Sequence, residues 1–268
     1  WSNMRNIWMT VSYEGTNYAG FQRQPTRMTV QQLLEDALEK LTQKKTIVYF
    51  VARTDAGVHA WGQECTFYTE SKIPGDRFCY AINAMLPKDV RVLQSREMEE
   101  DFSVRRMNYG KTYGYILSER KEESPFLRRY CWSVGRLLND NLMRAASEVL
   151  IGEHDFTSFR GNNSVPANPI RNLIDIQIIR DEHIVRIYVT GEGFLYHMVR
   201  NIAGALVDIG TGVMTKEQLM HILEVKDRKQ LGMTAPAEGL ALLHVYFNPV
   251  QKEDIHKTIK QAFWPWTK

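Results

Sequence analysis

The residues best suited to chemistry form a short segment in which a guanidinium and a carboxylate stand two positions apart. The segment reads R-T-D-A-G-V-H-A over residues 53–60 and follows a β-branched and aromatic run. An aspartate in a glycine-bearing turn has a structural explanation, because its carboxylate accepts a hydrogen bond from the following backbone. It also has a chemical one: if Arg53 and Asp55 face one cleft, the opposite charge keeps the carboxylate ionised and nucleophilic. These residues leave both interpretations of Asp55 open.

Other familiar kinds of catalytic site are missing from the sequence. It has no H-E-x-x-H zinc motif, no phosphate-binding P-loop and no G-x-S-x-G nucleophile elbow. Two G-x-G sequences, at 191–193 and 210–212, lack the third glycine of a dinucleotide-binding fingerprint. The three cysteines, Cys65, Cys79 and Cys131, form no C-x-x-C pair and are typical of reduced thiols in a cytosolic protein. We therefore expect no metal, and neither hydride transfer nor NTP hydrolysis.

The segment at 53–60 is one of an ordered set of motifs that resembles the TruA-type tRNA pseudouridine synthases. The hallmark of that family is G-R-T-D-A-G-V-H-A, and seven further segments agree in order and spacing. They lie at residues 13–25, 29–31, 102–105, 111–115, 154–159, 191–202 and 235–240. Two positions depart from the family: Ala52 replaces the usual glycine, and Phe21 stands where a tryptophan is common. Alanine disfavours positive φ, so the loop at Ala52 can differ from the family's. A paralogue that acts on another RNA, such as ribosomal RNA, is therefore an alternative.

The resemblance implies an isomerase that converts uridine to pseudouridine in tRNA, at positions 38–40 of the anticodon stem-loop. This reaction breaks the N-glycosidic bond, rotates the uracil and joins its C5 to the ribose, and it needs no cofactor. By the same resemblance Asp55 is the catalytic aspartate and Tyr113 stacks on the base and serves the proton step at C5. Arg200 pairs with the catalytic carboxylate, and Arg53 fills the gap that the extruded base leaves.

General physical arguments agree with these roles but leave alternatives open. An enzyme that rearranges a base must take it out of the stack, which favours an aromatic face for the base. Taken alone, Tyr113 is more typical of a strand-core tyrosine. Arg200 lies among apolar residues of an expected helix, where an arginine needs an anionic partner. That partner is Asp55 in the catalytic interpretation, or a structural carboxylate such as Asp208 in the plain one.

A basic segment adjoins the expected active-site strand. Residues 105–136 contain eight lysines and arginines against three acids, with four tyrosines interleaved. Such a surplus is usually a solvated face, but here it also suits an RNA backbone. The expected phosphate-binding residues are Arg53, Arg105, Lys111, Arg128 and Arg129.

The elements that must position these residues mix strands and helices in both halves of the chain. Alternating or β-branched patterns predict strands at 6–13, 46–51, 63–68, 90–93, 111–117, 171–180, 183–190 and 240–247. Helical spacing predicts one helix that begins at Thr29 and one in the tail. It predicts four more helices, over 76–86, 140–150, 194–209 and 216–223. Few βαβ crossovers occur, so the class is α+β with largely antiparallel sheets. The resemblance implies two similar subdomains flanking a central RNA-binding cleft, 1–105 and 106–250, with an extension over 251–268.

Composition is that of an ordinary globular protein. The 268 residues are 44% hydrophobic and 24% charged, with a net charge of +3, which neither requires nor excludes a nucleic acid. No apolar run is long enough to span a membrane and no signal-peptide pattern begins the chain, so we expect a cytoplasmic protein. The family implies a homodimer, and an apolar patch at Phe263, Trp264 and Trp266 suits either an interface or a docked tail. A catalytically silent RNA-binding module is the rival function.

Overall fold

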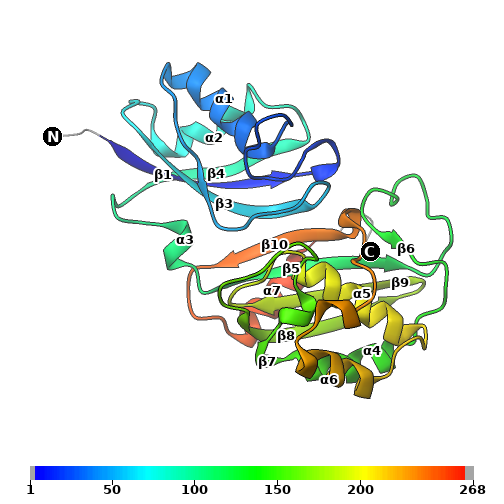
Figure 1. Ribbon diagram of the computed structural model, residues 1–268. Helices are drawn as coiled ribbons and strands as arrows, with labels where there is room; N and C mark the ends of the chain where they lie inside the picture. The colour runs from blue at the N-terminus through cyan, green and yellow to red at the C-terminus, as the bar shows by residue number, and fades with distance from the viewer. Residues whose placement is uncertain (1–3, 263–268) are drawn as a thin grey trace. The chain divides into compact units, whose positions relative to one another are not determined.

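The computed structural model describes residues 4–262, which form two units, each with its own strands and helices (Figure 1). Unit 1 comprises the described residues up to Tyr109 together with Leu242–Val250. Unit 2 comprises Gly110–Ala241 and the described residues from Gln251 on. The sequence places all of 106–250 in the second subdomain, whereas residues 106–109 and 242–250 belong to unit 1. Residues Phe263, Trp264 and Trp266 lie outside the described residues.

The sheet of unit 1 has the strand order β4-β1-β3-β10, with β2 also paired to β3. The strands are β1 (Arg5–Tyr13), β2 (Tyr49–Phe50), β3 (His59–Thr69), β4 (Val90–Met98) and β10 (Leu240–Tyr246). β1 runs antiparallel to both β3 and β4. Its alternate residues Ile7, Met9 and Val11 are fully buried, as the period of two predicts. The predicted strand over 46–51 is reduced to the two residues of β2.

The helices of unit 1 are α1 (Val30–Thr42), α2 (Phe78–Asn83) and the single turn α3 (Val104–Met107). Figure 1 shows α1 and α2 on the same face of the sheet. Thr29 caps α1 as its spacing predicts, since its side chain accepts a hydrogen bond from the backbone of Gln32. The helix predicted over 76–86 begins instead as a 3-10 turn, Gly75–Arg77, before α2.

The sheet of unit 2 has the strand order β5-β9-β8-β7. Its strands are β5 (Gly110–Ser118), β6 (Trp132–Ser133), β7 (Gly152–Asp155), β8 (Ile170–Asp181) and β9 (Ile184–Gly191). All pairs on this path are antiparallel, and the short β6 pairs parallel with β5. The predicted hairpin of β8 and β9 turns at Glu182, which has a φ of 53°. The α+β class with largely antiparallel strands is thereby confirmed.

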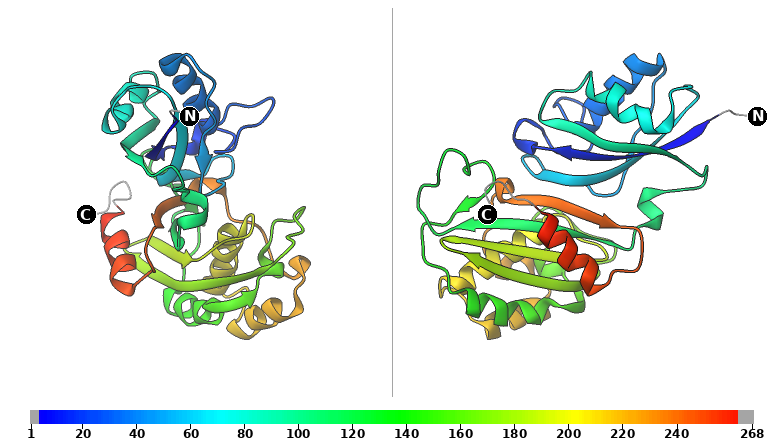
Figure 2. Two further views of the ribbon diagram at one scale, coloured as in Figure 1. Left: turned by 90° about the vertical axis from the view of Figure 1, so that its left-hand side faces the viewer. Right: turned by 180° about the vertical axis from the view of Figure 1, so that it is seen from behind.

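The helices of unit 2 lie on both faces of its sheet. They are α4 (Asp140–Ser147), α5 (Met198–Gly210), α6 (Lys216–Val225) and α7 (Lys252–Gln261). Figure 2 shows α4, α5 and α6 on one face and α7, from the predicted tail extension, on the other. The helix predicted from residue 194 begins four residues later, because His197 has a φ of 63° and ends the preceding turn.

Candidate active site

The turn that bears Asp55 is fixed by its neighbours in unit 1. The Asp55 carbonyl accepts a hydrogen bond from Val58 N at 3.1 Å, which closes the turn. Just before it, the Thr54 carbonyl accepts from Phe21 N at 3.2 Å, and the Thr54 hydroxyl lies 2.6 Å from the Tyr13 hydroxyl. The Asp55 side chain is half-buried, so the turn holds its carboxylate at the surface of the unit.

A second loop packs tightly against this turn. Gly20 has a φ of 85°, and a Cβ at this position would lie 2.5 Å from the Thr54 carbonyl oxygen. Only glycine meets both conditions without strain. The loop that precedes α1 therefore supports the backbone of the Asp55 turn from behind.

Ala52, the departure from the family pattern, fits its place without strain. It is 3% exposed and is not among the residues with positive φ. Its N–H donates to Gln63 Oε1 at 3.1 Å, and its carbonyl accepts from Gln63 Nε2 at 2.5 Å. The added methyl group thus leaves the approach to the Asp55 turn intact, and Gln63, which the motifs did not indicate, anchors it.

Two predicted RNA-binding residues also belong to unit 1. Arg53 is exposed. Arg105, on α3, is exposed as well, and its guanidinium lies 5.5 Å from the centre of the Phe50 ring. Both cations stand beside the strand β2 that leads into the Asp55 turn.

In unit 2, Tyr113 belongs to an aromatic pair. It lies on β5 and is 7% exposed, with its ring 5.1 Å from that of Phe194 in an edge-to-face arrangement at 84°. Phe194 precedes α5 in the segment that sequence periodicity assigned to the helix. Two residues along the same face of β5, the Tyr115 hydroxyl donates to the Pro236 carbonyl at 2.6 Å. Tyr113 is thus a well-packed residue, as its plain interpretation expects, and its ring orientation is fixed.

Arg200, on α5, is held by the segment that contains the A-P-A-E-G-L motif. Its Nε donates to the Ala235 carbonyl at 2.7 Å, and Ala235 N donates to the Arg200 carbonyl at 3.2 Å. Burial raises the pKa of Tyr115 well above its usual value, with Glu238 adding to the rise and Arg200 opposing it. Asp208 is the carboxylate that the plain interpretation offers as a partner for Arg200. Burial raises the pKa of Asp208, and the charge of Arg136 opposes that rise.

Arg228 is a buried residue that sequence reasoning missed. It is 6% exposed and donates five hydrogen bonds to uncharged oxygens. The acceptors are the carbonyls of Arg160, Leu231 and Gly232 and the side chains of Asn201 and Thr234, at 3.0 to 3.3 Å. In the sequence it stands between charged neighbours and has the pattern of an exposed residue. In the structure it fixes the segment that leads to Ala235 and hence to Arg200.

Lys111 lies two residues before Tyr113 on β5. It is half-buried, and burial together with the nearby Arg171 lowers its pKa to about 8. Arg171 is the second residue of β8 and was not indicated by the motifs. Unit 2 thus brings Lys111, Tyr113 and Phe194 together with this second cation.

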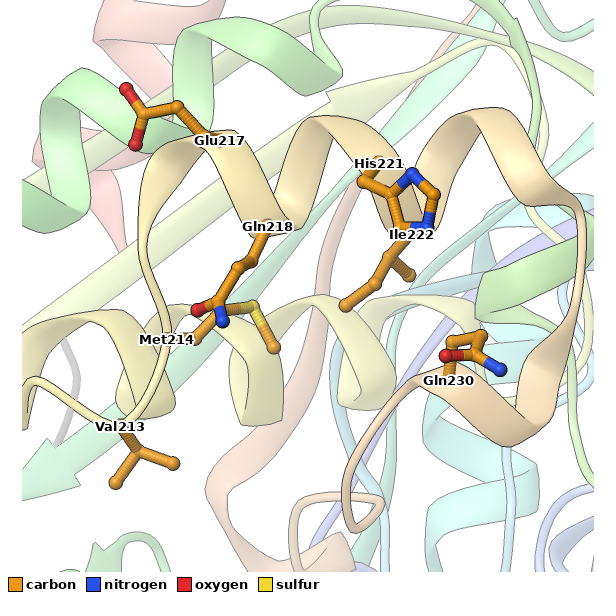
Figure 3. A pocket seen from close by; sticks show the side chains of 7 residues that line it. All are labelled: Val213, Met214, Glu217, Gln218, His221, Ile222 and Gln230. Atoms are coloured by element: carbon orange, nitrogen blue, oxygen red, sulfur yellow. The ribbon is translucent and has the colours of Figure 1, made fainter.

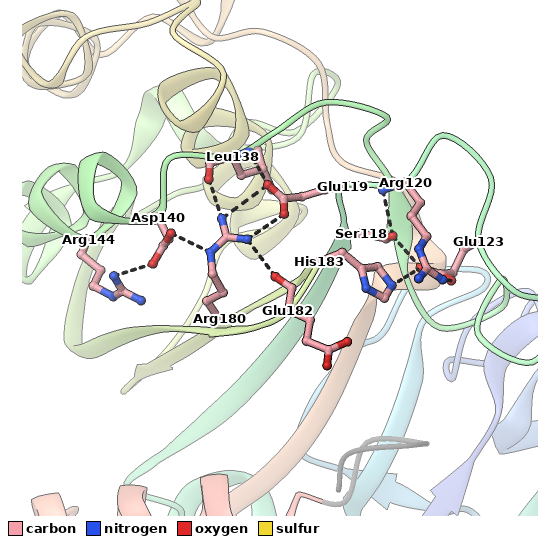
Figure 4. A network of polar contacts seen from close by, with 10 residues as sticks. All are labelled: Ser118, Glu119, Arg120, Glu123, Leu138, Asp140, Arg144, Arg180, Glu182 and His183. Atoms are coloured by element: carbon pink, nitrogen blue, oxygen red, sulfur yellow. Dashed lines mark hydrogen bonds and ion pairs between the residues drawn. The ribbon is translucent and has the colours of Figure 1, made fainter.

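Arg128 and Arg129 are exposed on a loop that a buried carboxylate anchors. Glu123 accepts from the Ser118 hydroxyl at 2.5 Å and from Ser124 N at 2.8 Å, with His183 3.2 Å away (Figure 4). Burial alone would raise the pKa of Glu123, but these contacts lower it below its usual value. The base of the loop is therefore fixed by unit 2 while its basic residues face outward.

A separate cavity of about 450 Å³ lies on α6 and the segments beside it (Figure 3). It is lined by Val213, Met214, Glu217, Gln218, His221, Ile222 and Gln230. None of the residues with a predicted role in catalysis or RNA binding lines it. Within residues 4–262, no three His, Cys, Asp or Glu side chains are grouped as metal ligands would be, and no helix is long and apolar enough to cross a membrane. All three cysteines are buried and free.

Comparison with known proteins assigns the chain to a family. A family model described as tRNA pseudouridine synthase matches residues 9–105 and 146–248. tRNA pseudouridine synthase A of Acetivibrio thermocellus is 41% identical over 244 residues, which cover 91% of this chain and 100% of the relative. The protein of the same name from Clostridium acetobutylicum has the same identity and coverage. Among solved structures, a Cbf5-Nop10-Gar1 complex matches with a TM-score of 0.37 and 12% identity, over 75% of this chain and 45% of that one. With matches that span both units and nearly all of its length, the chain belongs to the tRNA pseudouridine synthase family.

Proposed function

We propose that this chain converts uridine to pseudouridine in the anticodon stem-loop of tRNA, at positions 38–40, with Asp55 as the catalytic carboxylate. The observation that carries the proposal is the family match, whose model spans the Asp55 turn in unit 1 and Arg200 in unit 2. The fixed backbone of the Asp55 turn supports it, because a catalytic group needs a defined position.

The reaction balances without a cofactor. The bond between N1 of uracil and C1′ of the ribose breaks, the base rotates, and a bond between C5 and C1′ forms. The proton at C5 is lost and N1 gains one. Extruding the uridine from its stack costs a few kcal/mol, and we propose that Arg53 occupies the vacated space.

Each remaining site residue has a role that suits its surroundings. The Tyr113 ring, fixed by Phe194, offers a face to the base and a hydroxyl for the proton step at C5. Arg200, whose Nε donates to the Ala235 carbonyl, takes the role that the family resemblance gives it, as the arginine that pairs with the catalytic carboxylate. Arg53, Arg105, Lys111, Arg128 and Arg129 would bind RNA phosphates.

We further propose that the protein is a cytoplasmic homodimer whose two subunits hold one RNA. The basic segment 105–136, which includes Arg128 and Arg129, supports this proposal, because its eight lysines and arginines against three acids are more charge than a pocket for one nucleotide uses. Closed two-fold dimers are also the commonest oligomers.

The test is to treat an anticodon stem-loop transcript and a ribosomal RNA fragment with the purified protein and to map pseudouridine by carbodiimide modification. We expect product in the stem-loop and none in the ribosomal fragment. Product in the ribosomal RNA alone would support the paralogue alternative. Tight RNA binding without any product would support the silent binding module. The unstrained Ala52 gives neither alternative an advantage.

A further inference from the structure

Lys111 and Arg171 form a pair of cations without an acidic partner. Within the described residues, no carboxylate lies within ion-pair distance of either side chain, and Lys111 has no hydrogen-bond acceptor. Arg171 is the one charged group that shifts the pKa of Lys111, and it lowers that pKa. Two like charges that are partly removed from water are unfavourable unless an anion joins them.

Three segments of unit 2 bring the two cations to one place. Lys111 lies on β5, where it pairs with Gly191 at the end of β9. Arg171 comes from the start of β8, and its side chain passes Gly193. A Cβ added at Gly193 would lie 3.5 Å from Arg171 Cδ and 3.6 Å from Arg171 Nε. Phe194 follows at once and packs on Tyr113. The pair therefore adjoins the aromatic face proposed for the base.

Arg171 is held so that part of its guanidinium stays available. One terminal nitrogen, Nη1, donates to the carbonyls of Asn168 and Ile170, both at 2.7 Å. The other nitrogens, Nε and Nη2, have no acceptor among the described residues. The unpartnered nitrogens of both cations are still in contact with solvent. In the described part of the chain, the fully buried side-chain nitrogens and oxygens without a partner belong only to Asn6 and Arg186. The Nε and Nη2 edge of the Arg171 guanidinium is thus available next to the Lys111 ammonium group. Phosphate groups prefer such a combination of hydrogen-bond donors.

The spacing along β5 matches one nucleotide. Lys111 and Tyr113 are two residues apart on the same face of a strand, which separates them by about 7 Å. This is close to the separation of a base from a phosphate group of its own nucleotide. We propose that Lys111 and Arg171 bind one phosphodiester group of the RNA, the one that flanks the uridine whose base lies against Tyr113. This inference rests on the proposed function, since it takes RNA as the ligand and Tyr113 as the base site.

The experiment uses an anticodon stem-loop with a single neutral methylphosphonate in place of the phosphate on the 5′ or the 3′ side of the target uridine. For the wild type, we expect one of the two replacements to weaken binding about tenfold, which corresponds to 1.4 kcal/mol. Lys111→Gln and Arg171→Gln should each bind the unmodified RNA about tenfold more weakly. Neither variant should lose more affinity when that same linkage is neutral. The slope of log affinity against log salt should fall by about 0.7 to 0.9 for each phosphate that a variant no longer neutralises.

Two further variants keep the test decisive. Lys229→Gln removes an exposed charge elsewhere in unit 2 and should behave as the wild type with every RNA. Lys111→Arg should retain the sensitivity to the neutral linkage, and thermal melting shows that each variant is folded. The inference is overturned if the neutral linkage weakens RNA binding by Lys111→Gln or Arg171→Gln as much as it weakens binding by the wild type. It is also overturned if Lys111→Gln binds the unmodified RNA as tightly as the wild type does. If the wild type binds the stem-loop but forms no pseudouridine, the proposed function fails while the phosphate interaction is still measured.

Discussion

Backbone contacts hold the Asp55 turn in place. The hydrogen bonds described above for this turn involve the Asp55 and Thr54 carbonyls and the Thr54 hydroxyl. We therefore expect Asp55→Asn to fold and to bind tRNA almost as the wild type does, while isomerisation is abolished because the amide is not a nucleophile. Release of tritium from C5-labelled uridine in tRNA measures the reaction. Asp76→Asn, an exposed aspartate of unit 1, serves as the control, and a variant that kept a tenth of the wild-type turnover would contradict the assignment of Asp55.

A second carboxylate of unit 1, Glu64 on β3, should make stability depend on pH. It is 5% exposed and accepts hydrogen bonds from the Trp8 indole at 2.5 Å and the Thr10 hydroxyl at 2.9 Å. Burial raises its pKa from 4.5 to about 7, against these hydrogen bonds and the charge of Arg96. The folded state therefore holds this proton more tightly than the unfolded chain does. Its contribution is complete below pH 4.5 and is lost as the pH rises to about 7.

Glu64→Gln should remove that pH dependence. Because the amide has no charge to bury, the variant should be more stable than the wild type above pH 7, by an amount on the order of 3 kcal/mol or less. Urea unfolding at a series of pH values measures the free energy. Glu39→Gln, an exposed change on α1, should leave the wild-type curve unaltered. A Glu64→Gln curve that is parallel to the wild type from pH 4.5 to 7 would show that Glu64 is not the titrating group.

At the scale of elements, the segment between α6 and β10 is fixed by Arg228 and in turn orients Arg200 on α5. Arg228→Met would leave several buried carbonyls without donors, at a cost on the order of 3 kcal/mol. Arg228→Lys keeps the charge but cannot reproduce the planar fork. We expect Arg228→Lys to fold and to lower kcat about tenfold with little change in the affinity for tRNA. Steady-state kinetics beside a binding assay would test this, and a change in affinity alone, with kcat intact, would contradict it.

The sequence pattern correctly predicted a helix or a strand wherever one face of that element is buried. The stripe of α1 and the alternation of β1 are examples, since their periodicities match the faces that are buried in unit 1. The patterns failed where tertiary contacts decide. The apolar residues 194–197 continue the helical stripe of α5, but Phe194 packs on Tyr113 and the chain turns at His197. The polar edge strand β7 has no alternation to reveal it.

The candidate site shows the same division. Motif matching proposed Asp55, Tyr113 and Arg200 because these residues lie in segments that resemble the family's motifs. Arg171, Gln63 and Arg228 were missed, because a charged or polar side chain has the same sequence pattern whether it is solvated or buried. Only the packing of separate segments around them reveals their contacts.

At the scale of the whole molecule, the proposed dimer predicts complementation between subunits. Arg128→Glu with Arg129→Glu should weaken RNA binding through the basic loop, and Asp55→Asn should remove chemistry. If the loop of one subunit holds the RNA on which Asp55 of the other acts, mixed dimers should regain activity that neither parent has. The assay is pseudouridine formation after the two variants are mixed. Light scattering that finds a fully active monomer at the working concentration would rule the dimer out.

The discontinuity of unit 1 has a consequence for how the protein is made. Its sheet is completed by β10, which pairs with β3 and whose residues from Leu242 on follow Gly110–Ala241 in the chain. Translation proceeds from the N-terminus, so the first 109 residues leave the ribosome well before this strand exists. Until then the edge of β3 opposite β1 is open except where the two residues of β2 pair with it, and an open edge is a template for pairing with other chains. The unit that bears Asp55 therefore cannot be finished until β10 has been made, and a chain interrupted before Leu240 lacks it in finished form.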